Sequence, residues 1–373
     1  MKRIISALIL VSVAMSVAAQ PSVSNAFIVE KKLAATPVKN QAMTGTCWCF
    51  SATSLVESQC LKNNLGELDL SEMFTVRNIY IEKAKNYILR QGHAQFGEGG
   101  LGHDLVRAIG TYGAEPESVY SGLKENQKNH NHVQLIASLQ SYLDSTLKHM
   151  PVADNWFDGY VKILDAALGT PPATFEYMGK SYTSKTFATQ LMKFNPDDFV
   201  NITSFTHQPY YKPFILQVPD NFSNAAYYNL PLNEMTKLVE DAVSKGYSVM
   251  WDADVSNNGF HQEKGLALLL DEKEKYESDA ITADLPEMKW DIAKRQQLYE
   301  DLTTQDDHLM HITGIEKSKS GKTFFIVKNS WGVIGPDKGY INVSEAYFSI
   351  NTVSLVVPKA AISTALLTKL GIK

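Results

Sequence analysis

The segment QAMTGTCWCFSATSLVESQC, residues 41–60, contains all three cysteines of the 373-residue chain. Thr46 is a residue type that caps helix N-termini, and apolar residues then recur at helical spacing as far as the Asn63 region. The pattern predicts a helix that begins at Cys47. A thiol at a helix N-terminus is a candidate nucleophile, because the helix dipole favours its thiolate form.

The spacing of the cysteines argues against a disulfide. Cys49 and Cys60 would lie about 16 Å apart along one helix at ~1.5 Å per residue, whereas a disulfide needs Cα atoms within about 7 Å of each other. Cys47 and Cys49 point to different faces of the helix, and an odd count leaves one thiol free. We therefore expect Cys49 and Cys60 to be buried fillers.

The composition is that of an ordinary globular protein, with 44% hydrophobic and 20% charged residues and a net charge of −5. Without a basic excess, no nucleic-acid partner is expected. Lys2 and Arg3 precede an apolar run that ends in small residues, which predicts a signal peptide over residues 1–19 and a periplasmic or secreted protein. No later apolar run is long enough to span a bilayer, so no membrane span is expected after signal cleavage.

Helical patterns dominate the first half of the chain and strand-like runs the second half, which predicts an α+β fold with two lobes. We expect a helical lobe over residues 20–124 and a helical insertion over 125–200. A β-rich lobe over 201–358 and a short tail over 359–373 complete the chain. The last run predicted as strand is GYINVSEAYF.

Three short stretches carry candidate chemistry: GTCWCF (45–50), DDHLMHITGI (306–315) and FFIVKNSWG (324–332). A thiol nucleophile needs a base beside it and a third group that orients the base. A histidine at the start of a strand and an asparagine on the next strand fit these roles. The amide of Gln41, with the Cys47 backbone N–H, could donate hydrogen bonds to a developing oxyanion.

His308 and His311, beside Asp306 and Asp307, also form an HxxH pair that could suggest zinc. On a strand, however, residues three apart face opposite sides. We therefore expect no metal site and no cofactor.

The order PVKNQ…GTCWCFS…HLMHITG…VKNSWG resembles the papain-like cysteine peptidases. The stretch EGGLGHDLVRAIGTYGAEPESVY resembles the bleomycin hydrolase and aminopeptidase C branch of that family. The resemblance implies a papain-like fold with a helical lobe and a β-barrel-like lobe. It implies that Cys47 is the nucleophile, that Asn329 orients the catalytic histidine and that Gln41 contributes to the oxyanion hole. The family pattern HAMxxTGV assigns the catalytic role to His308 rather than His311.

The resemblance also implies how peptide substrates bind. Gly99 and Gly100 match a glycine pair whose backbone pairs with an extended substrate, and glycine lets another backbone approach closely. Trp331 is expected to shield the His–Asn hydrogen bond from water.

The chain departs from the family at both ends. Only a short lead precedes Cys47, so activation by removal of a prosegment is not expected. In the family, a C-terminal arm enters the cleft, and its carboxylate selects substrates with a free α-amino group. Here the chain stops at LVVPKAAISTALLTKLGIK, which leaves endopeptidase action as an alternative to aminopeptidase action. The same departure argues against carrying over the family's hexameric homo-oligomer. A non-catalytic, peptide-binding papain fold is a further alternative.

Overall fold

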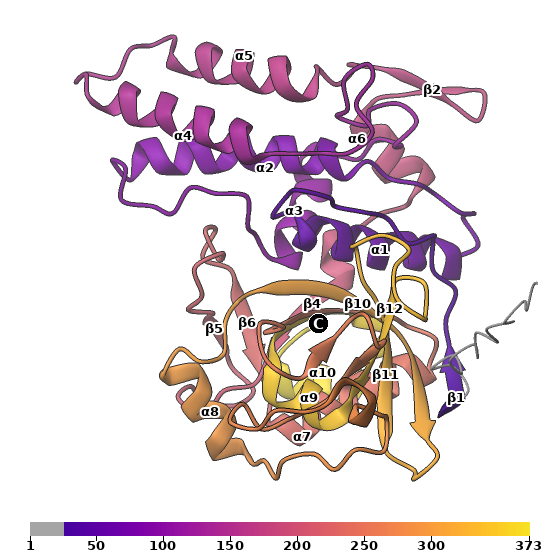
Figure 1. Ribbon diagram of the computed structural model, residues 1–373. Helices are drawn as coiled ribbons and strands as arrows, with labels where there is room; N and C mark the ends of the chain where they lie inside the picture. Colours follow the sequence, from indigo (N-terminus) through magenta and orange to yellow (C-terminus); the bar gives the residue numbers. More distant parts are fainter. Residues whose placement is uncertain (1–25) are drawn as a thin grey trace, which may run out of the picture.

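The computed structural model describes residues 26–373, and the predicted signal peptide lies outside them. The chain forms a helical lobe and a β-rich lobe that meet along one broad junction (Figure 1). No helix within residues 26–373 has both the length and the apolar character that crossing a bilayer requires.

The helical lobe contains five long helices. They are α1 (Cys47–Lys62), α2 (Glu72–Leu89), α3 (Gly102–Tyr112), α4 (Val133–Leu147) and α5 (Trp156–Leu168). The antiparallel pair α4–α5 lies over α2, on the side away from the β-rich lobe (Figure 1). Buried side chains of the insertion, such as Leu139 and Leu164, belong to the same apolar cluster as Trp48 on α1. The insertion therefore shares the core of the lobe that carries the candidate nucleophile.

The end of the insertion is less helical than its sequence pattern predicts. A hairpin of β2 (Phe175–Tyr177) and β3 (Lys180–Tyr182) follows α5. Its two-residue turn places Met178 and Gly179 at φ values of 48° and 75°, which suits a type I′ turn. Short turns follow: α6 (Ser184–Thr186), η2 (Phe187–Leu191) and η3 (Pro196–Asp198).

The β-rich lobe is built on an 11-stranded sheet. Its strands are β1 (Phe27–Lys32), β4 (Phe199–Thr203), β5 (Pro213–Ile215), β6 (Ala226–Asn229), β7 (Val249–Ala253), β8 (Phe260–His261), β9 (Leu266–Ala267), β10 (His308–Ser318), β11 (Thr323–Lys328), β12 (Tyr340–Ser344) and β13 (Thr352–Pro358). The spatial order is β5-β6-β4-β13-β7-β10-β11-β12-β9-β8, and β1 pairs with β10. Strand β1, which the sequence analysis did not predict, ties the lead segment of the helical lobe to the sheet of the other lobe.

Helices cover the remaining parts of the β-rich lobe. They are α7 (Leu232–Ser244), η4 (Ser278–Ala280), α8 (Ile292–Glu300), α9 (Glu345–Asn351), η5 (Lys359–Ala361) and α10 (Thr364–Leu370). The prediction of a strand over all of GYINVSEAYF is wrong in its second half. The side chain of Ser344 accepts a hydrogen bond from the Tyr347 backbone N–H at 3.0 Å and so caps α9, which ends the strand.

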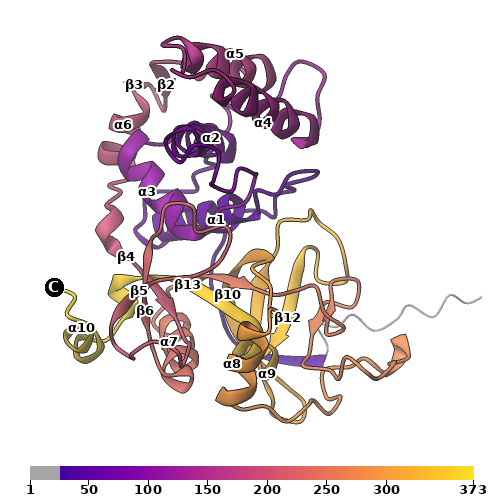
Figure 2. The same ribbon diagram turned by 90° about the vertical axis from the view of Figure 1, so that its left-hand side faces the viewer.

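Helix α1 and the central strand β10 bring residues that are distant in the sequence to the junction of the two lobes. Helix α1 lies at the bottom of the helical lobe and faces the sheet, above β13 and β10 (Figure 2). Strand β10 pairs with β7 and β11, so that Leu309 lies opposite Asp252 and His311 lies opposite Lys328. The start of α1, the start of β10 and the end of β11 therefore meet at the junction of the lobes.

Candidate active site

Cys47 is the first residue of α1 and is 8% exposed. The neighbouring Trp48 is fully buried, and its indole N–H donates a hydrogen bond to the Glu98 carbonyl at 3.0 Å. A Cβ atom at position 100 would lie only 3.1 Å from the Trp48 ring, so glycine fits closely there. Trp48 therefore fixes the glycine-rich loop beside the start of α1.

His308 and Asn329 are joined across neighbouring strands. His308 Nε2 lies 2.7 Å from Asn329 Oδ1. That oxygen also accepts a hydrogen bond from the Ser330 backbone N–H at 2.7 Å, while Asn329 Nδ2 donates to Gln262 Oε1 at 2.8 Å. These contacts orient the amide so that its oxygen faces the histidine. His308 Nε2 must then carry the proton, which leaves Nδ1 as the acceptor of the neutral ring.

Gln262 is a site residue that sequence analysis missed. It holds the asparagine amide, and its own Nε2 donates to the Tyr340 carbonyl at 3.1 Å. It follows the short strand β8, outside the three stretches with candidate chemistry, and no sequence signal on its own points to it.

Trp331 lies against the histidine. The ring centroids of His308 and Trp331 are 4.7 Å apart at an interplanar angle of 32°. The position matches the expected cover over the His–Asn hydrogen bond, and both partners of that bond are buried.

The junction of the lobes brings Cys47 next to the start of β10. Burial raises the pKa of the Cys47 thiol to about 12, while a hydrogen bond from the backbone N–H of Leu309 lowers it. Leu309 adjoins His308, whose pKa burial lowers. Burial therefore opposes ionisation of both groups, whereas the position of Cys47 at a helix N-terminus favours the thiolate.

Gln41 is fixed at the same junction. Its Nε2 donates to the Thr44 carbonyl at 2.8 Å, and its Oε1 accepts from the Ser330 hydroxyl at 2.6 Å. An amide nitrogen carries two hydrogens, so one N–H remains for another acceptor. The contacts hold the amide just before α1, where the sequence analysis places an oxyanion donor.

The glycine pair is more enclosed than expected. The Lys83 ammonium donates to the Gly99 carbonyl, and Gly100 is buried. A Cβ at Gly99 would overlap the Asp220 carboxylate. The structure therefore covers one side of the pair at which an extended substrate is expected to bind.

The sequence pattern of the Peptidase C1-like family matches residues 98–372, which is more than half of the chain. The chain belongs to this family. The pattern of the papain family cysteine proteases matches residues 24–83, the part that contains Cys47.

Similar proteins agree with this membership in the Peptidase C1-like family. Aminopeptidase C of Streptococcus thermophilus is 24% identical over 387 residues, covering 91% of this chain and 84% of the relative. Bleomycin hydrolase of Mus musculus is 24% identical, with 87% and 80% covered. The crystal structure of PepW from Lactobacillus rhamnosis matches with a TM-score of 0.74 at 21% identity, over 92% of this chain and 84% of that one. The resemblance inferred from the motifs, and the α+β fold that it implies, are confirmed.

Behind the site, this member of the Peptidase C1-like family carries a buried polar network. His311 is fully buried, and its Nδ1 lies 2.9 Å from the Ser54 hydroxyl, to which Lys328 donates at 2.8 Å. A cavity of about 10 Å³ adjoins these groups. His308 and His311 thus contact different partners, and His311 has the contacts of a structural residue.

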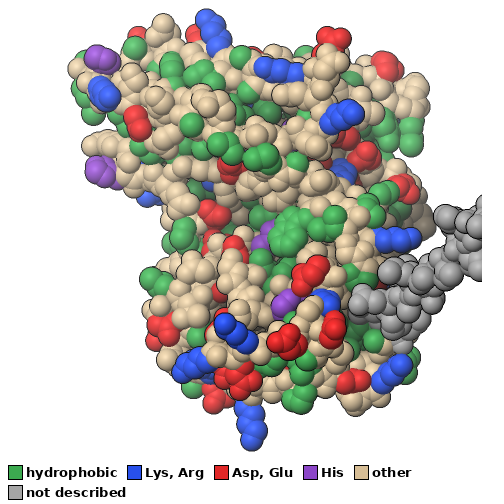
Figure 3. Space-filling view, in the orientation of Figure 1, with side chains coloured by type: hydrophobic (Ala, Val, Ile, Leu, Met, Phe, Trp, Pro, Cys, Tyr) green, Lys and Arg blue, Asp and Glu red, His purple; other side chains and the backbone are tan. Residues whose placement is uncertain are grey.

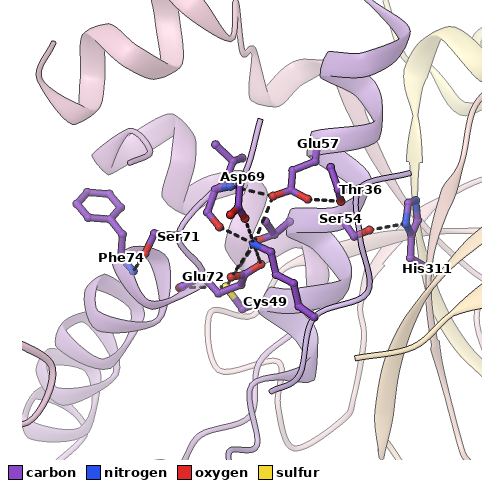
Figure 4. Close-up of polar contacts among 12 residues, drawn as sticks. Thr36, Cys49, Ser54, Glu57, Asp69, Ser71, Glu72, Phe74 and His311 are labelled. Atoms are coloured by element: carbon purple, nitrogen blue, oxygen red, sulfur yellow. Dashed lines mark hydrogen bonds and ion pairs between the residues drawn. The ribbon is translucent and has the colours of Figure 1, made fainter. Parts of the chain in front are cut away.

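The network continues from Lys328 through Thr36 to Glu57, which belongs to an ion cluster with Asp69 and Glu72 (Figure 4). The Lys39 ammonium lies 2.8 Å from Glu72, 2.7 Å from Asp69 and 3.5 Å from Glu57. Burial alone would lower the pKa of Lys39, but the three carboxylates together raise it above its ordinary value. Glu57 also accepts from the Thr36 hydroxyl at 2.5 Å. The cluster joins the lead segment to α1 and α2.

Replacing Glu57 with alanine is expected to destabilise the fold by about 3 kcal/mol. The residue is 1% exposed, and its removal leaves the Leu70 backbone N–H, now bonded at 2.8 Å, without an acceptor. Urea unfolding measures the effect. Gln59→Ala on the same helix is the control, since that side chain bonds only to the exposed Asn63. A loss below about 1 kcal/mol for Glu57→Ala would show that the cluster is dispensable.

Proposed function

We propose that the chain is an exported thiol peptidase that hydrolyses peptide bonds through Cys47, His308 and Asn329, as an aminopeptidase of the bleomycin hydrolase type. The observation that carries the proposal is the hydrogen bond between His308 and Asn329. This bond leaves the Nδ1 lone pair of His308 free. The next residue, Leu309, contacts the Cys47 sulfur through its backbone N–H.

In the proposed reaction, His308 Nδ1 takes the thiol proton as the sulfur attacks the peptide carbonyl. The N–H groups of Cys47 and Gln41 stabilise the oxyanion. The imidazolium then gives its proton to the leaving amine, and a thioester forms on the sulfur. Water, deprotonated by His308, hydrolyses the thioester and restores the thiol.

The function is tested with matched peptides that carry free and acetylated N-termini. An aminopeptidase cleaves the free-amine peptide strongly and the acetylated one weakly. Equal cleavage of both supports the endopeptidase alternative. Binding without cleavage of either peptide supports the non-catalytic alternative and contradicts the proposal.

Replacing Gln41 with alanine is expected to lower kcat by about 10²-fold, because the oxyanion loses one donor. Steady-state kinetics with a free-amine substrate measures the loss. Asn131→Ala, at an exposed side chain near Met43, serves as the control. A change of less than about threefold for Gln41→Ala would place the oxyanion donors elsewhere.

The acid limb of the pH–rate profile is expected to report the protonation of His308. The base must be neutral to take the thiol proton, and burial lowers its pKa from the ordinary value of 6.5. As pH falls, the midpoint of the decline in kcat/KM should therefore lie below pH 6.5. A decline centred above pH 6.5 would contradict a buried, neutral His308 as the base.

A further inference from the structure

An acidic cluster lies beside the glycine pair. The loop between β5 and β6 brings Asp220 against Gly99. Gln95 donates to Asp220 Oδ1 at 3.2 Å, and the Asp220 backbone N–H donates to Asp306 Oδ2 at 3.4 Å. A peptide backbone that runs past Gly100 and Gly99 would meet this loop. A chain bound along the glycine pair would therefore end beside the Asp220 carboxylate.

Asp252 extends the cluster toward the nucleophile. It lies opposite Leu309 across β7 and β10, so both side chains point to the same face of the sheet. Leu309 packs in the apolar cluster that contains Cys47. Asp252 is fully buried, and Ser354 donates to its Oδ2 at 2.9 Å. Within residues 26–373, its Oδ1 has no partner except the facing carboxyl of Asp306.

The three carboxyl groups of the cluster affect one another. Burial raises the pKa of Asp252 well above its ordinary value, and repulsion from Asp306 adds to the rise. Burial also raises the pKa of Asp306, to about 7, and repulsion from Asp220 adds to that rise. The facing carboxyls of Asp252 and Asp306 therefore titrate as a pair. Lys83, buried beside them, attracts the Asp220 carboxylate and donates to the Gly97 carbonyl at 3.0 Å.

Acidic side chains are visible at the junction of the lobes, beside a histidine and an apolar surface (Figure 3). The carboxylates of the cluster act on the nucleophile: Asp252, Asp220 and Asp306 each raise the pKa of Cys47. A cation bound among them is therefore close enough to the sulfur to affect its ionisation.

We propose that Asp220, with the Asp252–Asp306 pair, binds the protonated α-amino group of the peptide substrate and so selects free N-termini. The proposal rests on the peptidase function proposed above and names the residues that would confer its amino-terminal specificity. An ammonium brings one positive charge and three N–H donors, which suit a group of carboxyls in which the Oδ1 atoms of Asp252 and Asp306 accept no hydrogen bond from an N–H or hydroxyl within residues 26–373. An acylated or extended N-terminus loses that charge or meets the loop at Gly99.

The bound ammonium also has a consequence for the chemistry. Its charge offsets the carboxylates that disfavour the Cys47 thiolate, so the correct substrate helps to ionise the nucleophile. Selection of the free amine is therefore expected in kcat as well as in KM.

The test is a double-mutant cycle in which one change removes the Asp220 charge from the enzyme and the other removes the α-amine from the substrate. The substrates are an aminoacyl arylamide with a free α-amine and its des-amino analogue, in which hydrogen replaces the amine. The parent enzyme should favour the free amine by about 10²-fold or more in kcat/KM. Asp220→Asn should lower kcat/KM for the free amine by about 10- to 10²-fold and leave the analogue within about twofold. Asp241→Asn, on the half-exposed face of α7, should change neither.

An equal loss on both substrates, or an unchanged preference for the free amine, would overturn the role of Asp220. Asp306→Asn repeats the test from the other end of the cluster if circular dichroism shows that Asp220→Asn is unfolded. A parent enzyme that cleaves both substrates equally also overturns the inference but leaves the peptidase function intact. A parent enzyme that cleaves neither contradicts the proposed function itself.

Discussion

Cys47→Ala is expected to lower peptide turnover by at least about 10³-fold while leaving the fold intact. The sulfur is the atom that would form the thioester, and it contacts the backbone N–H of Leu309, next to His308. The Cys49 thiol contacts the Glu72 carbonyl instead, and Cys60 lies near the C-terminal end of α1. The kinetic loss is measured with a free-amine arylamide. Urea unfolding checks that stability is retained, since the substitution removes a single atom at the edge of the core.

Cys49→Ala is the matched control for this loss. Cys49 is fully buried, two residues further along α1, and its thiol donates to the Glu72 carbonyl at 3.3 Å. Its replacement should cost stability but leave turnover per folded molecule nearly unchanged. Full activity in Cys47→Ala, or an equal loss in Cys49→Ala, would contradict the assignment of the nucleophile.

His308→Ala is expected to lower kcat/KM by about 10²- to 10⁴-fold, the range in which general acid–base groups contribute. The ring would act twice, first as the base for the thiol and then as the acid for the leaving amine. Kinetics near neutral pH measures the loss. Circular dichroism shows whether the variant is folded.

His311→Ala separates the two histidines of the HxxH pair. It removes the contact with Ser54 and opens the buried network behind the site, so it should lower the unfolding midpoint. Activity per folded molecule should fall far less than in His308→Ala. A larger kinetic loss for His311→Ala would reverse the assignment drawn from the sequence motif.

The sequence predicts the parts of the site that local patterns determine. The start of α1 follows from helical spacing, and the observed helix begins at Cys47. Thr46 occupies the N-cap position, but its side chain makes no capping hydrogen bond and lies instead 2.6 Å from the Thr44 hydroxyl. His308 and Asn329 lie at the ends of apolar, strand-like runs, and those runs pair in the sheet. The register between β10 and β11 then brings His308 and Asn329 within hydrogen-bond distance.

Long-range contacts explain what the sequence does not predict. Gln262 and Asp220 lie in irregular segments, where residue type alone gives no position in space. They reach the site only because the sheet brings their loops there. The burial that raises the pKa of Cys47 is likewise not visible in the sequence, whereas a helix N-terminus is.

Alkylation by iodoacetamide, followed by peptide mapping and activity assay of the same samples, tests the central claim most directly. The account predicts that activity falls in proportion to modification of Cys47, that bound substrate slows both, and that Cys49 and Cys60 react only after unfolding, being 0% and 4% exposed. Activity that survives complete modification of Cys47, or inactivation that follows another residue, would contradict it.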